Sequence, residues 1–226
     1  MKKRWYCIPA ALTLVCLILA VTIRSSYQNA GEDIYNYGFE TENTFAAVFQ
    51  EFSVSDVNQI PGKLIENSDL IVKVKYSGNR LVTGEGFYSP VNVEKVYKGN
   101  SNFNGKQLYI LEDMSTFTYT RYVNTVSKAY LPLQRNNEYV LLLKKVQFDS
   151  GRTLNDFESS QYYPITQTAA GAYRLSSQKQ TKVFSWDKKP ESMNSLIGYD
   201  VPVEEKKQLD IYYELKNQVF GLLDIS

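Results

Sequence analysis

The N-terminal segment limits what the rest of the chain can be more strongly than any other part of the sequence. Three cations at residues 2–4 precede an uncharged, mostly apolar run at residues 5–23. As a helix, this run would cover about 28 Å at a rise of about 1.5 Å per residue, close to the hydrocarbon thickness of a bilayer. We therefore expect a transmembrane anchor over residues 1–24. Its anchoring side chains include Trp5, Leu12, Leu17 and Ile23.

The charges around this run set its orientation. Only Arg24 follows it, so the positive-inside rule predicts a single-pass protein of the cell membrane, with a cytoplasmic N-terminus and residues 25–226 outside. A cleaved signal peptide is the second interpretation, although Ala20-Val21-Thr22 is a poor cleavage site. A lipid anchor ranks third, because neither Cys7 nor Cys16 follows a small residue.

Composition excludes several kinds of active site. The chain has no histidine, which removes His general bases, Ser-His-Asp and Cys-His arrangements and histidine-rich zinc sites. Both cysteines lie inside the apolar run, so the exported part has neither disulfides nor a thiolate nucleophile. About 180 residues after the anchor must therefore be held together by their own hydrophobic core.

Charge argues against nucleic acid as a partner. Subtracting the four cations of residues 1–24 from 25 leaves 21 cations against 24 anions, a net charge of −3 for residues 25–226. A domain of this charge lacks the basic face that phosphate backbones require.

After a polar tether at residues 25–43, the chain shows short strands separated by turn residues. Alternation or apolar blocks predict strands at 69–76, 88–97, 106–111, 117–126, 138–146, 162–166, 172–175 and 181–186. This spacing favours a sandwich or a small barrel, which we place at residues 44–200.

The C-terminal residues 201–226 have a different period. Leu209, Tyr212, Tyr213, Val219 and Leu223 recur at helical intervals, and acidic residues stand at the start of the segment. We expect a helix whose apolar stripe packs on the domain.

The order of these segments resembles a known group of folds. The resemblance is carried by Ser68-Asp69-Leu70-Ile71-Val72, Val93-Glu94-Lys95-Val96-Tyr97-Lys98-Gly99, Glu138-Tyr139-Val140-Leu141-Leu142-Leu143 and Ala170-Gly171-Ala172-Tyr173-Arg174-Leu175. Over residues 55–186 the chain is similar to exported bacterial domains with an OB-type barrel, such as the netrin-like module of tissue inhibitors of metalloproteinases. The resemblance implies a mainly β, OB-like barrel with flanking helices, a binding role without catalytic residues, and a Gram-positive-type source. The inhibitors meet the protease metal through an N-terminal cysteine, which this domain lacks, so protease inhibition is not implied.

Candidate chemistry is sparse. The carboxylates Glu112 and Asp113 are neighbours on a strand end and point to opposite faces, so they form a poor acid–base pair. We interpret them, with Asp149, Asp156 and Glu158, as solvated loop charges. The spacing of the last three does not match a calcium loop. We expect no metal site and no cofactor.

Aromatic residues suggest one binding site. The chain has 18 Tyr and 11 Phe, which first of all suit the half-buried surfaces of a β-rich domain. Loops and one sheet face of OB barrels bind ligands, often by stacking, so the speculative ligand-binding residues are Phe117, Tyr119, Tyr122, Tyr162 and Tyr163. The alternative, which we favour, is that these rings fill the barrel or cover its mouth.

Together these features predict a non-catalytic, membrane-anchored extracellular binding module. Its partner would be an envelope protein, a peptide or a wall polymer. One alternative is an accessory subunit of a membrane complex. An exposed apolar stripe on the C-terminal helix would favour this alternative. A carboxylate-based envelope hydrolase is a weaker alternative, because it needs two facing carboxylates.

Overall fold

The computed structural model describes residues 12–22, 38–42, 57–76, 78–83, 86–112, 123–127, 129–176, 178–184 and 193–225. Its strands are β1 (Gly38–Glu42), β2 (Leu70–Tyr76), β3 (Leu81–Thr83), β4 (Gly86–Lys98), β5 (Gln107–Glu112), β6 (Val123–Ser127), β7 (Glu138–Lys145), β8 (Gln161–Pro164) and β9 (Ala172–Leu175). Around these strands, the described residues form the α-helices α3 (Ile60–Asn67), α4 (Asp156–Ser159) and α5 (Lys206–Leu222).

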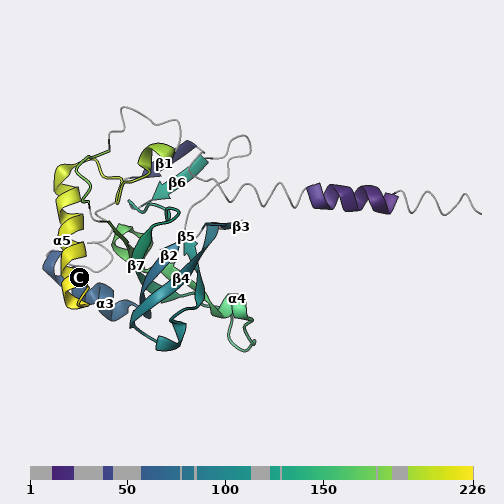
Figure 1. Ribbon diagram of the computed structural model, residues 1–226, viewed down its shortest axis with the longest axis horizontal. Helices are drawn as coiled ribbons and strands as arrows, with labels where there is room; N and C mark the ends of the chain where they lie inside the picture. The colour runs from purple at the N-terminus through teal and green to yellow at the C-terminus, as the bar shows by residue number, and fades with distance from the viewer. Residues whose placement is uncertain are drawn as a thin grey trace, which may run out of the picture.

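Five of these strands close into a barrel. Their order is β2-β4-β5-β8-β7, and β7 pairs with β2 to complete the ring. The β5–β8 pair is parallel, whereas the other four pairs of the ring are antiparallel. The predicted small, mainly β barrel with flanking helices is therefore confirmed (Figure 1), and this closed mixed barrel is compatible with an OB-like fold.

The barrel has one core inside and a second on part of its outer surface. Alternation along each strand separates the two. Val72, Val91 and Leu141 belong to the inner cluster, whereas Ile71 and Val140, next to Val72 and Leu141 along their strands, belong to the outer one. The outer cluster lies against α3 and α5, which share one side of the barrel (Figure 1).

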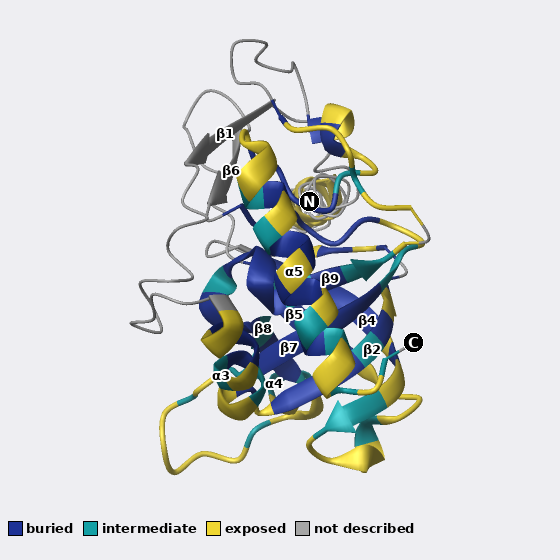
Figure 2. Ribbon diagram, turned by 90° about the vertical axis from the view of Figure 1, so that its left-hand side faces the viewer, coloured by how far each residue is buried: buried dark blue, intermediate teal, exposed yellow. Residues whose placement is uncertain are grey.

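The predicted C-terminal helix is present as α5. Glu205 forms a capping box with Gln208, which satisfies backbone N–H groups at the start of the helix. Leu209, Tyr212 and Val219 are at most 1% exposed, so the apolar stripe packs on the domain as predicted. In Figure 2 the exposed face of α5 points away from the dark blue strands behind it.

The structure differs from the sequence-based expectations at three places. Residues 181–184, the described part of the predicted strand at 181–186, form no strand; the Phe184 N–H donates to the Val203 carbonyl at 2.7 Å. The sequence did not predict β3, which has only three residues and, among the described strands, pairs with β4 alone. Within the predicted tether, β1 pairs in parallel with β6.

At the N-terminus the structure describes one helix, residues 12–22, whose side chains, Leu12 and Leu17 included, are exposed. Among the described residues, no helix has both the length and the apolar character needed to cross a bilayer. The rest of the predicted anchor, with Trp5 and Ile23, lies outside the described residues.

Candidate functional site

A hollow of about 540 Å³ lies over β5, beside the helix α4. Its lining comes from two places in the chain: Phe103, Lys106, Gln107 and Tyr109 on and just before β5, and Asp156, Phe157, Ser159 and Ser160 on and just after α4. This volume is within the usual range for small-molecule sites. In Figure 1, α4 lies on the side of the barrel away from α5. The hollow thus occupies a part of the outer barrel surface that the large helix does not cover.

The sequence builds α4 through a capping box. The Asn155 side chain accepts from the Glu158 N–H at 2.9 Å, and the Glu158 carboxylate accepts from the Asn155 N–H at 3.1 Å. Arg152 donates to the other Glu158 oxygen at 2.6 Å. These bonds to backbone and side chain hold the pKa of Glu158 below its ordinary value. The short helix is therefore anchored at its N-terminus, although it has only one turn.

Two bonds tie the other end of α4 to the barrel. The Tyr109 N–H on β5 donates to the Ser160 carbonyl at 3.0 Å. The Lys145 ammonium on β7 donates to the Ser159 carbonyl. Burial lowers the pKa of Lys145. As a result, Phe157 is held against the strands rather than carried on a loose loop.

Aromatic rings line the hollow. Phe157 meets Tyr109 with ring centroids 4.6 Å apart and Tyr88, on β4, at 5.4 Å, both edge to face. Phe103 follows the turn at Gly99, whose φ of +101° and 2.9 Å approach of a Cβ to the Asp69 carbonyl require glycine. Three segments that are distant in sequence therefore bring their rings together on one face.

Two of the five predicted aromatic residues are described by the structure, and neither lines this hollow. Tyr162 is 6% exposed and belongs to the inner core; its ring meets Phe103 edge to face at 6.0 Å. The Lys145 ammonium lies over the Tyr162 ring, 4.5 Å from the ring centroid. Tyr163 is half-buried on β8. Phe117, Tyr119 and Tyr122 lie outside the described residues, so the binding role of all five stays a prediction.

Four of the polar groups in the lining of this hollow are free to bind, whereas the Ser159 and Ser160 hydroxyls donate to backbone carbonyls of α4. Within the part of the chain that the structure describes, no hydrogen bond or ion pair engages the Lys106 ammonium, the Gln107 amide, the Tyr109 hydroxyl or the Asp156 carboxylate. Gln161 is paired with Tyr109 in the β5–β8 ladder, so both side chains are on the outer face. Gln161 is 3% exposed and its Oε1 accepts no hydrogen bond from the described residues. An unmet buried acceptor costs about 1–3 kcal/mol of folding free energy. Gln161 is not part of the lining of the hollow, so this oxygen belongs to the structure beneath it.

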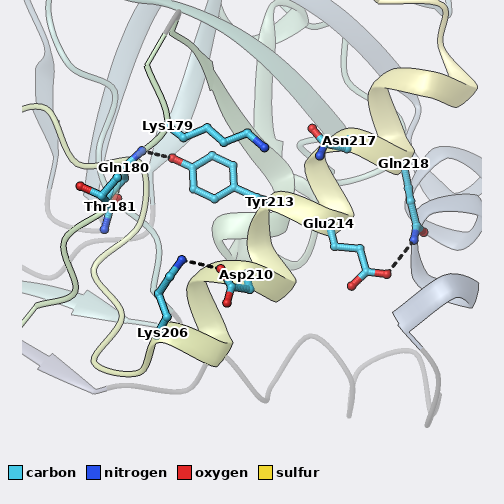
Figure 3. Close-up of a pocket in the computed structure, with 9 residues that line it drawn as sticks. All are labelled: Lys179, Gln180, Thr181, Lys206, Asp210, Tyr213, Glu214, Asn217 and Gln218. Atoms are coloured by element: carbon cyan, nitrogen blue, oxygen red, sulfur yellow. Dashed lines mark hydrogen bonds and ion pairs between the residues drawn. The ribbon is translucent and has the colours of Figure 1, made fainter.

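A second hollow, of about 500 Å³, lies between α5 and the segment 179–181 (Figure 3). Its polar groups are largely engaged with one another. Lys206 pairs with Asp210 at 2.5 Å, and Gln218 donates to Glu214 at 3.3 Å. The Gln180 N–H donates to the Tyr213 hydroxyl. We call this hollow closed, in the sense that most of the polar groups in its walls are already paired within the chain.

The Tyr213 hydroxyl also belongs to a buried network beneath α5. It donates to Asp200 Oδ2 at 2.6 Å, and Arg174 Nε donates to Asp200 Oδ1 at 2.7 Å. Burial, and then the bond to the Asp200 carboxylate, raise the pKa of Tyr213. Lys216 donates to the Arg174 carbonyl at 2.6 Å. These bonds join β9, α5 and the segment before α5, which is a structural role.

A third polar cluster corrects one interpretation of the sequence. Glu112 is not a solvated loop charge: its side chain is fully buried and pairs with Arg80 at 3.2 Å. Its second oxygen accepts from the Tyr130 hydroxyl at 2.9 Å and from the Leu133 N–H at 2.7 Å. Burial raises the pKa of the Tyr130 hydroxyl well above its ordinary value. Every Glu112 oxygen is thus partnered, and the cluster closes one end of the barrel interior.

Of the other carboxylates, Asp149 and Asp156 are solvated as expected, whereas Glu158 is not a loop charge: its side chain is 17% exposed and pairs with Arg152. Asp149 and Asp156 are exposed, and Glu158 caps α4. Among the described residues, no three acidic or cysteine side chains converge where a metal ion could be held. Asp113 lies outside the described residues.

The hollow over β5 was not found in the sequence, because Phe103, Tyr109 and Phe157 share no local pattern. The capping-box spacing from Asn155 to Glu158 was the one local signal that marks α4. Comparison of the chain with family models, curated proteins and solved structures finds no match to any of them.

Proposed function

We propose that this protein is a non-catalytic binding module and that the outer surface of β4 and β5 is its binding face. One observation carries the proposal: in the hollow over β5, aromatic rings stand beside polar groups that no described residue engages. Such a surface is ready for a ligand, because it offers apolar contact area and unused donors and acceptors together.

The position of the hollow supports the same proposal. In OB-type barrels the ligand face is formed by the second and third strands and by the loop between the last two strands. Here β4 and β5 are the second and third strands of the ring along the chain, and α4 belongs to the connection between β7 and β8. We also propose that the barrel is similar to the netrin-like group. That similarity supports a role in binding rather than catalysis.

The cellular setting is part of the proposal. The basic start and apolar run of residues 1–24 argue for a membrane anchor that holds the barrel outside the cell. Partners would then be an envelope protein, a peptide or a wall polymer, and the domain's net charge of −3 argues against nucleic acid.

Neither alternative function gains support from a specific contact. An accessory subunit would use the stripe of α5, but Leu209, Tyr212 and Val219 of that stripe are buried against the domain. A carboxylate hydrolase needs two facing carboxylates, and the lining of the hollow over β5 contains one, Asp156.

The test is capture of a ligand from the native envelope fraction by the full-length chain in detergent, with protein and polymer both assayed. We expect saturable binding that Phe157→Ala abolishes or weakens at least about tenfold, because about 1.4 kcal/mol of ring contact is lost.

The matched control is Phe148→Ala. Phe148 belongs to the same β7–β8 connection and packs on Arg152, with the guanidinium carbon 5.3 Å from its ring centroid, but does not line the hollow. Circular dichroism must show both variants folded. Binding that both variants retain, or that both lose while folded, would contradict the proposed face.

A further inference from the structure

We infer that the hollow over β5 recognises a neutral or nearly neutral glycan chain. This inference rests on the proposed binding function and names the chemical class of its ligand. It follows from which groups line the hollow, which of them are unused, and which modes of recognition the surrounding strands prevent.

A sugar ring presents apolar C–H faces and a rim of hydroxyl groups that both donate and accept. The hollow offers the complementary surface, since Phe103, Tyr109 and Phe157 provide ring area. Lys106 and the Gln107 amide nitrogen donate, whereas Asp156 accepts.

The charges in the hollow disfavour a polyanion. Lys106 is the one cation of the lining, and Asp156 opposes it with one negative charge. A phosphate-rich polymer would need several cations along its path, and its affinity would fall steeply with salt. A ligand without net charge avoids both the repulsion from Asp156 and the salt dependence.

The strands disfavour an extended peptide. A peptide that adds to a sheet needs a free strand edge. Near Tyr109, however, β5 is paired with β4 on one side and with β8 on the other. The backbone of β5 is therefore occupied by the barrel, and recognition here must use side chains, as stacked sugars do.

The experiment is calorimetric titration of the full-length chain with three neutral tetrasaccharides: chitotetraose, cellotetraose and maltotetraose. Polyphosphate and a neutral tetrapeptide are the contrasting probes. The detergent must be a polyoxyethylene type, because the sugar headgroup of a glycoside detergent would compete for the hollow. Each titration is repeated at low and high salt with the wild type, Phe157→Ala, Tyr109→Ala, Asp156→Asn and Phe148→Ala.

We expect at least one glycan to bind with little change between low and high salt. Phe157→Ala and Tyr109→Ala should weaken it about tenfold, Asp156→Asn less, and Phe148→Ala less than about twofold. No binding of any of the three glycans, or glycan binding that Phe157→Ala leaves unchanged, would overturn the inference. Binding of polyphosphate or of the peptide alone, lost in Phe157→Ala, would overturn the glycan assignment and leave the binding module intact.

Discussion

The hollow beside α5 and the hollow over β5 are similar in size, about 500 and 540 Å³, and both contain aromatic and charged side chains. They differ in what those side chains contact. Beside α5, the tyrosine hydroxyl and most of the charged groups are paired within the chain; over β5, the cation, the amide and the carboxylate of the lining meet no described partner. A hollow by itself therefore says little about function, whereas the unused bonding capacity of its walls says a good deal.

Replacement of Asp200, in the network beneath α5, should have the largest effect on stability. Asp200→Ala removes the fully buried carboxylate that pairs with Arg174 at 2.7 Å, leaving Arg174, among the described residues, only its bond to the Gly198 carbonyl, and removes the acceptor of the Tyr213 hydroxyl at 2.6 Å. Loss of one partner of a buried ion pair costs about 3–5 kcal/mol of unfolding free energy. Urea unfolding of the variant measures it. A loss below about 1 kcal/mol would mean that this network does not hold α5 in place.

High pH should weaken the same region. Folding raises the pKa of Tyr213 above the ordinary value of 10.0, chiefly through burial and then through Asp200. The folded state thus keeps this proton at a pH where the unfolded chain has lost it, so stability is constant below about pH 10 and falls as the pH rises further. Thermal melts from neutral pH to above pH 10 measure the fall. It should be shallower in Tyr213→Phe, and an unchanged slope would remove Tyr213 as its source.

Replacement of Tyr212 should change the free energy of unfolding by a smaller amount and in the opposite direction. Its hydroxyl is buried beneath α5, yet it has no hydrogen-bond partner among the described residues. Tyr212→Phe removes a desolvated polar group and keeps the ring, so we expect unfolding free energy to stay level or to rise by up to about 1 kcal/mol. Chemical denaturation of the variant and the wild type measures this difference in unfolding free energy. A clear loss of stability would reveal a buried water or other partner at this hydroxyl.

The smallest effects come from one lysine in each hollow. Lys206→Met breaks an exposed ion pair with Asp210 and should cost less than about 1 kcal/mol. Lys106→Met breaks no hydrogen bond or ion pair of the side chain among the described residues, so its midpoint of unfolding should equal that of the wild type. If Lys106→Met proved the more destabilising of the two, the contrast between the closed and the open hollow would fail.

The sequence predicted the elements whose pattern is local. Alternation in 69–76 and the apolar block 139–143 marked β2 and β7, and helical spacing marked α5. Burial of Glu112 could not be predicted, because its partner Arg80 lies 32 residues earlier and only barrel closure brings them together. The candidate site could not be predicted for the same reason, because its rings come from segments that only the folded barrel brings together.

Closure of the ring through β2 and β7 has a consequence for how the chain folds. β2 can pair early with β4, the next strand of the ring along the chain, but its other edge waits for β7, and β5 waits for β8. Until those late strands arrive, the apolar edge of β2, with Leu70, Ile71 and Val72, is exposed and open to pairing with other chains. Such non-local closure is slow. If the residues after the anchor reach the outside in the order of the sequence, we expect this half-built barrel to be the state most prone to aggregation. A mutation that delays the pairing of β7 should then lower the yield of folded protein before it lowers the stability of the finished fold.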